Sequence, residues 1–184
     1  MSKGLYTSHA TGNAVSKNMI IIADYTSLCK GDLIIVTGPS NSCCPICGGT
    51  LNVRSTCVRK VRKEGTAQRL RLRVMKCRIC QKTHREIPDD VIPYKRTGLT
   101  DFCETATAGI DEYPCDTSTW QRMKAWLSWF LAFARNVERS LVYSGLLLAA
   151  KAAGDSLRAE TAYFVRLVVN SGNWIHNRSA MPVA

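Results

Sequence analysis

The sequence lacks a long hydrophobic run. Its best apolar stretch, residues 141–150, lies between Arg139 and Lys151. A membrane-spanning helix needs roughly 18 to 20 consecutive apolar residues, so this stretch is more typical of a buried helix. The N-terminal residues also lack the pattern of a signal peptide. We therefore expect no membrane partner and a cytoplasmic protein, nucleoid-associated if it binds DNA.

The sequence also lacks the residue patterns of common enzymes. It contains no Gly-rich phosphate loop and no serine, cysteine or lysine constellation for covalent catalysis. The fragment His84-Arg85-Glu86 matches the H-x-E element of zinc deaminases, but it follows the cysteine pairs instead of preceding them. The chain has no room for the strand-rich domain of a two-metal nuclease. These absences predict a protein that is not an enzyme and has no small-molecule substrate.

Acidic residues are almost missing from one segment of the chain. Residues 54–85 contain twelve Lys or Arg residues and one acid, Glu64, which gives this segment a net charge of +11. The whole chain also has a net charge of +11, so the remaining residues are neutral in sum. Such a concentrated patch is typical of a surface that binds a phosphate backbone. The alternative is a solvated hairpin whose charges protect a sheet edge from aggregation.

The same basic segment lacks interleaved aromatic residues. Aromatic rings are the usual platforms on which proteins stack the bases of single strands. Their absence favours double-stranded DNA as the nucleic-acid partner, and binding to a structured RNA backbone stays open.

Cysteine, by contrast, is abundant, with nine residues in the chain. Four of them form two Cys-x-x-Cys pairs, with 29 residues between Cys47 and Cys77. Four thiolates complete the tetrahedral shell of structural zinc and leave no position for an activated water. Two alternatives stay open, in which Cys43 replaces Cys44 or His84 replaces a cysteine. We expect one structural Zn²⁺ with four ligands: Cys44, Cys47, Cys77 and Cys80.

The basic segment is predicted to be a β-hairpin. Residues 69–74 alternate arginine with an apolar residue, which places three arginines on one face and three apolar side chains on the other. Residues 53–61 are the expected antiparallel partner, with the turn near residues 63–66. One face of this hairpin is therefore expected to pack, and the other to meet solvent or a ligand.

Two shorter runs, residues 19–25 and 33–36, are rich in β-branched residues and are predicted to be strands beside the hairpin. Residues 1–18 are rich in small polar residues and are expected to form a flexible arm. We therefore expect a zinc-ribbon domain over residues 19–92.

Residues 93–184 are predicted to form a helical domain. Prolines between residues 88 and 96 disfavour helix and mark the expected boundary. Besides the first helices of this domain, apolar stripes predict two more, at about residues 137–153 and 157–169.

The first two helices of this domain have the outline of a helix-turn-helix over residues 97–135. Residues 99–108 form the first expected helix, and a strongly amphipathic helix begins near Ser118. A plain helical bundle is the alternative interpretation of the same pattern. If the motif is a DNA reader, the exposed residues near the start of the second helix contact the DNA: Thr119, Gln121, Arg122 and Lys124.

The predicted fold class is therefore α+β, with a small zinc ribbon followed by an all-helical half that contains the helix-turn-helix. The predicted nucleic-acid contacts are the four helix residues above and nine cations of the hairpin: Arg54, Arg59, Lys60, Arg62, Lys63, Arg69, Arg71, Arg73 and Lys76.

Three segments give the chain a family resemblance: Cys-Pro-Ile-Cys-Gly-Gly at 44–49, the run from Met75 to Pro88, and Pro-Tyr-Lys-Arg at 93–96. Over residues 19–140 the chain resembles uncharacterised bacterial zinc-ribbon proteins associated with mobile elements, and the N-terminal region of insertion-sequence transposases. The resemblance implies the same four zinc ligands and DNA binding, but no reaction. Gln81 departs from it, because a glycine commonly follows the second cysteine pair.

These observations predict a non-catalytic, zinc-stabilised DNA-binding protein, either a mobile-element accessory factor or a transcriptional regulator. The alternatives are an adaptor whose helical half docks a partner such as a recombinase, and an RNA-binding zinc ribbon.

Overall fold

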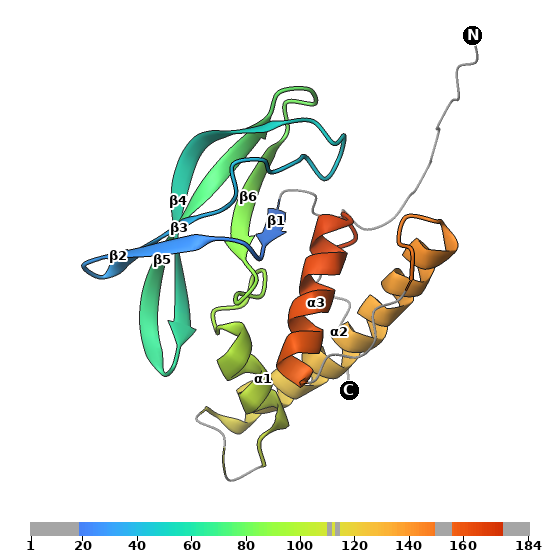
Figure 1. Cartoon of the computed structure of the whole chain (residues 1–184). Helices are drawn as coiled ribbons and strands as arrows, with labels where there is room; N and C mark the ends of the chain where they lie inside the picture. The colour runs from blue at the N-terminus through green and yellow to red at the C-terminus, as the bar shows by residue number, and fades with distance from the viewer. Residues whose placement is uncertain (1–18, 110–111, 113–114, 150–155, 175–184) are drawn as a thin grey trace.

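The computed structural model describes residues 19–109, 112, 115–149 and 156–174. The predicted arm, residues 1–18, lies outside the described residues. The described chain forms a curled sheet followed by helices (Figure 1). The strands are β1 (Met19–Ile22), β2 (Thr26–Lys30), β3 (Leu33–Thr37), β4 (Leu51–Lys63), β5 (Thr66–Cys77) and β6 (Thr83–Pro88), and the helices are α1 (Leu99–Thr107), α2 (Thr117–Tyr143) and α3 (Leu157–Asn170).

Strand β5 organises the sheet. It pairs antiparallel with β4 along nearly its whole length on one side. On the other side, β3 pairs in parallel with the first half of β5, and β6 pairs antiparallel with the second half. Strand β2 extends the sheet beyond β3, and β1 lies parallel to β6. The sheet is therefore mixed and has six strands.

The predicted hairpin is confirmed as β4 and β5. Its turn consists of Glu64 and Gly65, which both have positive φ angles, as a two-residue hairpin turn requires. The predicted alternation is also confirmed at Leu70 and Leu72, which are each 1% exposed. The neighbouring Arg69 is exposed. The apolar face of the hairpin thus contributes to the core.

The three helices share an aromatic core. The ring of Trp126 on α2 meets Phe102 of α1 edge-on at 5.2 Å and stacks on Phe130 at 4.8 Å. Trp174, which follows α3, lies 5.6 Å from Phe130. Both tryptophans are buried. Among the described residues, no helix combines the length and the apolar character that crossing a lipid bilayer requires.

The predicted fold class is wrong. The strands do not form a small ribbon, because segments before and after the cysteine pairs, β1 and β6, join the hairpin in one dominant six-stranded sheet. The described residues also contain no helix-turn-helix at the predicted place, since residues 108–116 separate α1 from α2, whereas that motif has a turn of 3 to 4 residues.

The predicted helix at residues 137–153 is wrong as well. Helix α2 runs without interruption for 27 residues to Tyr143, because no glycine or proline breaks its apolar stripe before Gly145. Residues 150–153 of that prediction lie outside the described residues. The helix predicted at 157–169 is confirmed as α3.

A side-chain clasp joins the helices to the sheet. Strand β1 pairs with β6 on one edge, and Asn170 at the end of α3 meets its other edge. The Asn170 side chain accepts a hydrogen bond from the backbone N–H of Ile21 at 2.8 Å and donates to the Ile21 carbonyl at 3.0 Å. The Asn170 amide thus makes the two hydrogen bonds to Ile21 that a peptide group of a neighbouring strand would make. The domain boundary near residue 92 stays a prediction, and this clasp crosses it.

We expect Asn170→Ala to lower the free energy of unfolding by about 2 to 4 kcal/mol, because it removes the partners of two buried backbone groups of Ile21. Urea unfolding measures this loss. The matched control is Asn173→Ala, since the Asn173 side chain bonds only to Ser171 among the hydrogen bonds described. Equal losses in the two variants would contradict the clasp.

Candidate metal centre and basic surface

The four cysteines of the two Cys-x-x-Cys pairs come together at one end of the sheet. One pair lies in the loop before β4, and the other at the end of β5 and in the turn that follows. All four Sγ atoms lie within 4.8 Å of one another. The Sγ atoms of Cys44 and Cys80 are 3.6 Å apart, and those of Cys47 and Cys77 are 3.5 Å apart. Four sulfurs at about 2.3 Å from a tetrahedral ion would be about 3.8 Å apart, so this group fits a metal ion.

The two pairs have the same backbone geometry. The N–H of Cys44 donates to the carbonyl of Gly49 at 2.9 Å, and the N–H of Cys77 donates to the carbonyl of Lys82 at 2.9 Å. In each turn, the residue four positions after the first cysteine must then adopt a positive φ. Gly48 adopts φ 70° and Gln81 adopts φ 62°. Gln81 therefore keeps the turn geometry that a glycine would provide, although an L side chain adopts this backbone conformation less readily.

Hydrogen-bond donors surround the sulfurs. The N–H of Ile79 lies 3.4 Å from the Sγ of Cys77. Burial would raise the pKa of the Cys77 thiol, but hydrogen bonds from the backbone N–H groups of Cys80 and Ile79, together with those of the Cys47 and Cys80 side chains, lower that pKa to about 6. A thiol that loses its proton easily is suited to metal binding.

The two alternative ligands are not part of this four-sulfur group. Cys43 is exposed, and its Sγ lies 3.8 Å from the carbonyl oxygen of Asn41. His84 is fully buried on β6, with its Nε2 3.3 Å from the Sγ of Cys44. An imidazole N–H in that position stabilises a thiolate from outside the ligand shell. The geometry thus favours Cys44 over Cys43 and makes His84 a supporting residue.

A buried ion pair anchors the loop that carries the first cysteine pair. Glu86 is 1% exposed and accepts from Arg73 Nε at 2.6 Å and Nη2 at 3.0 Å. The hydroxyl of Ser42 also donates to Glu86 at 3.0 Å, and Arg73 Nη2 donates to the Pro39 carbonyl at 2.9 Å. Glu86 was not predicted to belong to this site, because its only signal in the sequence is an acid between an arginine and an isoleucine in an extended segment.

Comparison with known proteins finds a family model that matches the part of the chain around this site. The family described as a domain of unknown function (DUF6431) matches residues 44–123. No curated protein and no solved structure matches the chain. The matched segment contains all four cysteines, the β4–β5 hairpin, β6 and the start of α2. The resemblance to transposase regions stays a prediction.

Four of the predicted nucleic-acid contacts on the hairpin already have protein partners. Besides the Arg73 pair, Arg69 forms an ion pair with Asp32 at 2.5 Å, and Lys63 forms one with Asp90. Arg59 donates through Nη2 to two backbone carbonyls. The side chains of Arg59, Lys63 and Arg73 therefore bond to other parts of the protein itself. Among the described residues, the other five hairpin candidates form no ion pair: Arg54, Lys60, Arg62, Arg71 and Lys76.

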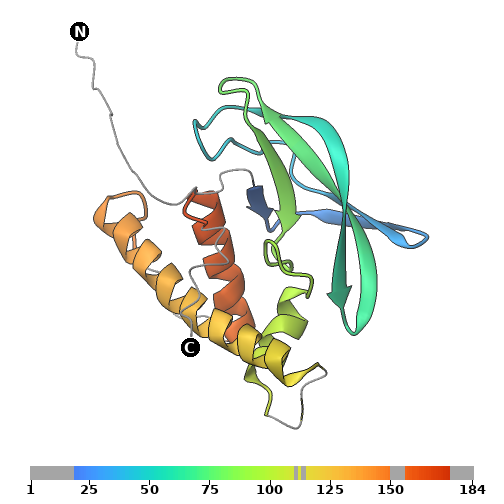
Figure 2. The same cartoon turned by 180° about the vertical axis from the view of Figure 1, so that it is seen from behind.

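Cations gather on one face of the sheet. In the strand register, Lys30 of β2 is opposite Leu33, Leu33 is opposite Arg69 of β5, and Arg69 is opposite Lys60 of β4. Directly opposite residues share a face, as do residues two apart on a strand. The β2–β3 hairpin projects away from the three described helices in both views (Figures 1 and 2). We call this surface the open face, and its cations are Lys30, Lys60, Arg62, Arg69 and Arg71.

The predicted contacts on the second helix lie at the start of α2. Arg122 donates to the Ser118 carbonyl and to the Thr119 hydroxyl, and the Lys124 ammonium lies 4.9 Å from the centre of the Trp120 ring. Gln121 is exposed. A cleft of about 750 Å³ lies between this region and the hairpin turn. It is lined by one cation, Arg62, and by four acids: Glu64, Asp101, Glu104 and Glu112. An acidic cleft repels phosphate, so the helix residues and the open face do not form one phosphate-binding surface.

Proposed function

We propose that the protein is a non-catalytic nucleic-acid-binding protein whose open face holds a phosphate backbone and whose fold is held by one structural Zn²⁺. The observation that carries the proposal is the cluster of five cations on the open face. Their only acidic partner among the described residues is Asp32, which pairs with Arg69. Lys30, Lys60 and Arg62 are exposed. Such an excess of positive charge on an extended surface attracts phosphates over several ångströms.

The spacing of these cations suits a repeating anion. Lys60 and Arg69 are directly opposite, and Arg62 and Arg71 each lie two residues further along their strands. Because the strands are antiparallel, Arg62 and Arg71 lie on opposite sides of the Lys60–Arg69 pair. Two residues of strand advance by about 6.6 Å, so the cations occupy three successive rows of the sheet. A rigid sheet holds such rows without the entropy cost of ordering a loop on binding.

Duplex DNA is the proposed form of nucleic acid. The side chains between the cations are aliphatic: Leu28 is 66% exposed and Val58 is 50% exposed. In the strand register they lie in the row that contains Arg71. No aromatic side chain belongs to the described rows of this face, so the surface offers phosphate contacts and not base stacking. Backbone contacts of this kind fit an accessory or regulatory role in which sequence preference comes from elsewhere.

Zinc is the proposed metal because tetrahedral thiolate sites favour it. Four cysteine ligands fill the coordination shell, so the ion would hold the loop before β4 against the β5–β6 turn. In this role it would fix the end of the strands that carry the open face.

Binding tests on the full, metal-loaded chain check the proposal. The variant Lys60→Gln/Arg62→Gln/Arg71→Gln removes three charges from the open face, and Arg122→Gln/Lys124→Gln/Arg139→Gln removes three exposed charges from α2. We expect the first variant to lower the slope of log Kd against log salt concentration by about 2.7, because each lost phosphate contact contributes about 0.9. The α2 variant should keep the slope of the wild type.

A salt-independent affinity for duplex DNA, or equal losses in the two variants, would overturn the proposal. Competition between duplex DNA and structured RNA, at one salt concentration, identifies the preferred backbone.

A second function, protein-interaction adaptor, is favoured by one observation. Tyr143 is 95% exposed and Leu148 is 102% exposed at the end of α2 and just beyond it. Exposed large apolar residues often mark partner surfaces. Replacing both by serine should leave nucleic-acid binding unchanged if the open face is the functional surface.

A further inference from the structure

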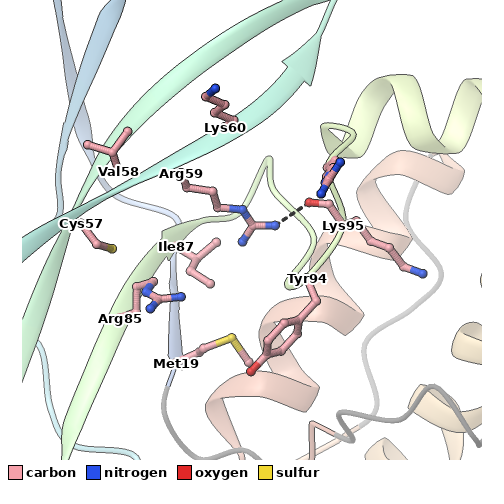
Figure 3. Close-up of a pocket in the computed structure, with 10 residues that line it drawn as sticks. Met19, Cys57, Val58, Arg59, Lys60, Arg85, Ile87, Tyr94 and Lys95 are labelled. Carbon is pink, nitrogen blue, oxygen red and sulfur yellow. Dashed lines mark hydrogen bonds between the residues drawn. The ribbon is translucent and has the colours of Figure 1, made fainter.

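A basic pocket lies where the free edge of β4 meets the connector between β6 and α1 (Figure 3). Its volume is about 290 Å³, close to the lower end of the range of small-molecule sites. Five of its lining residues are cationic and none is acidic: Arg59, Lys60, Arg85, Lys95 and Arg96. The charge of the pocket alone selects for an anion.

Two guanidinium groups face this pocket without a carboxylate between them. Arg59 is largely buried, and both of its described hydrogen bonds use Nη2, to the carbonyls of Ile92 at 2.7 Å and Lys95 at 2.6 Å. Burial lowers the pKa of Arg59, and the nearby charge of Arg85 lowers it further. Arg85 is exposed and forms no ion pair with a described residue. An anion between the two groups would offset both the burial and the repulsion.

The edge of β4 adds backbone donors. The N–H of Arg62 donates to the Arg96 carbonyl at 2.7 Å, and the Arg62 carbonyl accepts from the N–H of Gly98 at 2.8 Å. The backbone of Arg62 therefore faces the connector. Backbone N–H groups of residues two apart on an antiparallel strand point to the same edge. The N–H groups of Lys60 and Val58 therefore point to the same edge of β4 as that of Arg62, which is where the pocket lies. Neither N–H has a backbone partner among the described turn and loop hydrogen bonds. Outward backbone N–H groups are suitable donors to an oxyanion.

The opposite wall of the pocket is apolar. The Tyr94 ring extends beside Met19, with Ile87 between them and Arg59 (Figure 3). Tyr94 has a φ of 62°, in the left-handed region that a non-glycine residue rarely adopts. The Lys95 ammonium lies 4.4 Å from the centre of the Trp126 ring, on the helical side. A ligand in the pocket would therefore meet Arg59 and Arg85 on one side and the apolar wall on the other.

We propose that this pocket binds the phosphate group of a phosphate ester, with Arg59 and Arg85 holding the phosphate oxygens. The wall of Met19, Ile87 and Tyr94 contacts the organic part of the ester. This site goes beyond the proposed function, because Arg59 and Arg85 do not belong to the open face. The phosphate group has two possible sources, a free small ester or the phosphorylated end of a nucleic acid.

Calorimetric titration of the full, metal-loaded chain tests the pocket at constant ionic strength. The probes are inorganic phosphate, phenyl phosphate, and one oligonucleotide with a 5′-phosphate or a 5′-hydroxyl. The test variant is Arg85→Gln, and the matched control is Arg54→Gln, which removes an exposed arginine of β4 that does not line the pocket. We expect phenyl phosphate to bind more tightly than inorganic phosphate. Arg85→Gln should weaken phenyl phosphate at least about tenfold, because a charge-assisted contact is lost. The control should stay within about twofold.

Two outcomes separate the sources. Binding of phenyl phosphate that depends on Arg85 identifies a free ester site, and a 5′-phosphate preference of the oligonucleotide that is lost in Arg85→Gln identifies the end of a nucleic acid. If neither probe distinguishes Arg85→Gln from the wild type, the pocket proposal is overturned. The variant Arg62→Gln/Arg71→Gln, which removes two open-face cations that do not line the pocket, should still bind phenyl phosphate, so failure of the proposed function and failure of the pocket are distinguishable.

Discussion

Replacing Cys44 by serine should abolish stoichiometric zinc binding and the cooperative unfolding of the sheet end, whereas replacing its neighbour Cys43 should change neither. Of these two neighbours, only Cys44 belongs to the four-sulfur group, and Cys43 is exposed. Zinc bound by thiolates in small domains contributes on the order of 10 kcal/mol to folding, so its loss is comparable to the whole stability of a typical domain. We therefore expect the largest effect of any single substitution at this group.

Metal content per chain and thermal unfolding measure this prediction. The wild type and Cys43→Ser should hold one zinc per chain, and a chelator should convert both to the state of Cys44→Ser. A Cys43→Ser variant that loses its metal, or a Cys44→Ser variant that keeps one equivalent, would show that the wrong cysteine has been assigned. Because Cys43 and Cys44 are adjacent in the sequence, a difference between the two variants reports the loss of a metal ligand and not a general effect of substitution in this loop.

Arg73→Met should lower the free energy of unfolding by about 3 to 5 kcal/mol, because it leaves the buried carboxylate of Glu86 without its charge partner. Arg71→Met, two residues earlier on β5, should cost within about 0.5 kcal/mol, since Arg71 forms no described ion pair. Urea unfolding at saturating zinc measures these free-energy losses without a contribution from loss of the metal.

The double substitution Arg73→Met/Glu86→Leu sharpens this test. It removes both charges, so it should be more stable than Arg73→Met alone. If Arg73→Met and Arg71→Met cost the same, the buried ion pair is not a major contributor to stability. The result also bears on DNA binding, because a loss of affinity in an Arg73 variant would report a disturbed loop and not a missing phosphate contact.

Local patterns predicted the local structure of this chain well. The spacing of the cysteines predicted the group at Cys44 and Cys77, and the period-two pattern predicted the burial of Leu70 and Leu72. These features depend on residues that are close together in the sequence or repeat along one strand. Sequence alone is informative there, because alternation fixes the two faces of a strand.

Sheet pairing could not be predicted in the same way. Strand β6 has a buried face that consists of His84 and Glu86, so it shows no alternation of apolar and polar residues. The parallel pairs of β1 with β6 and of β3 with β5 join segments that are distant in sequence. The same limit applied to function. The groups that bond to Arg59 and Arg73 come from other segments: backbone carbonyls for Arg59 and the Glu86 carboxylate for Arg73. A count of positive charges does not reveal which cations are already bonded.

The clasp between Ile21 and Asn170 has a consequence for the order of folding. The two residues are 149 positions apart, and the sheet partner of β1, strand β6, begins only at Thr83. During synthesis, β1 leaves the ribosome with both edges unpaired, gains its first neighbour after β6 emerges, and its second only when α3 is complete. Closing a loop of this length is entropically costly, so β1 should be among the last elements to become protected from hydrogen exchange.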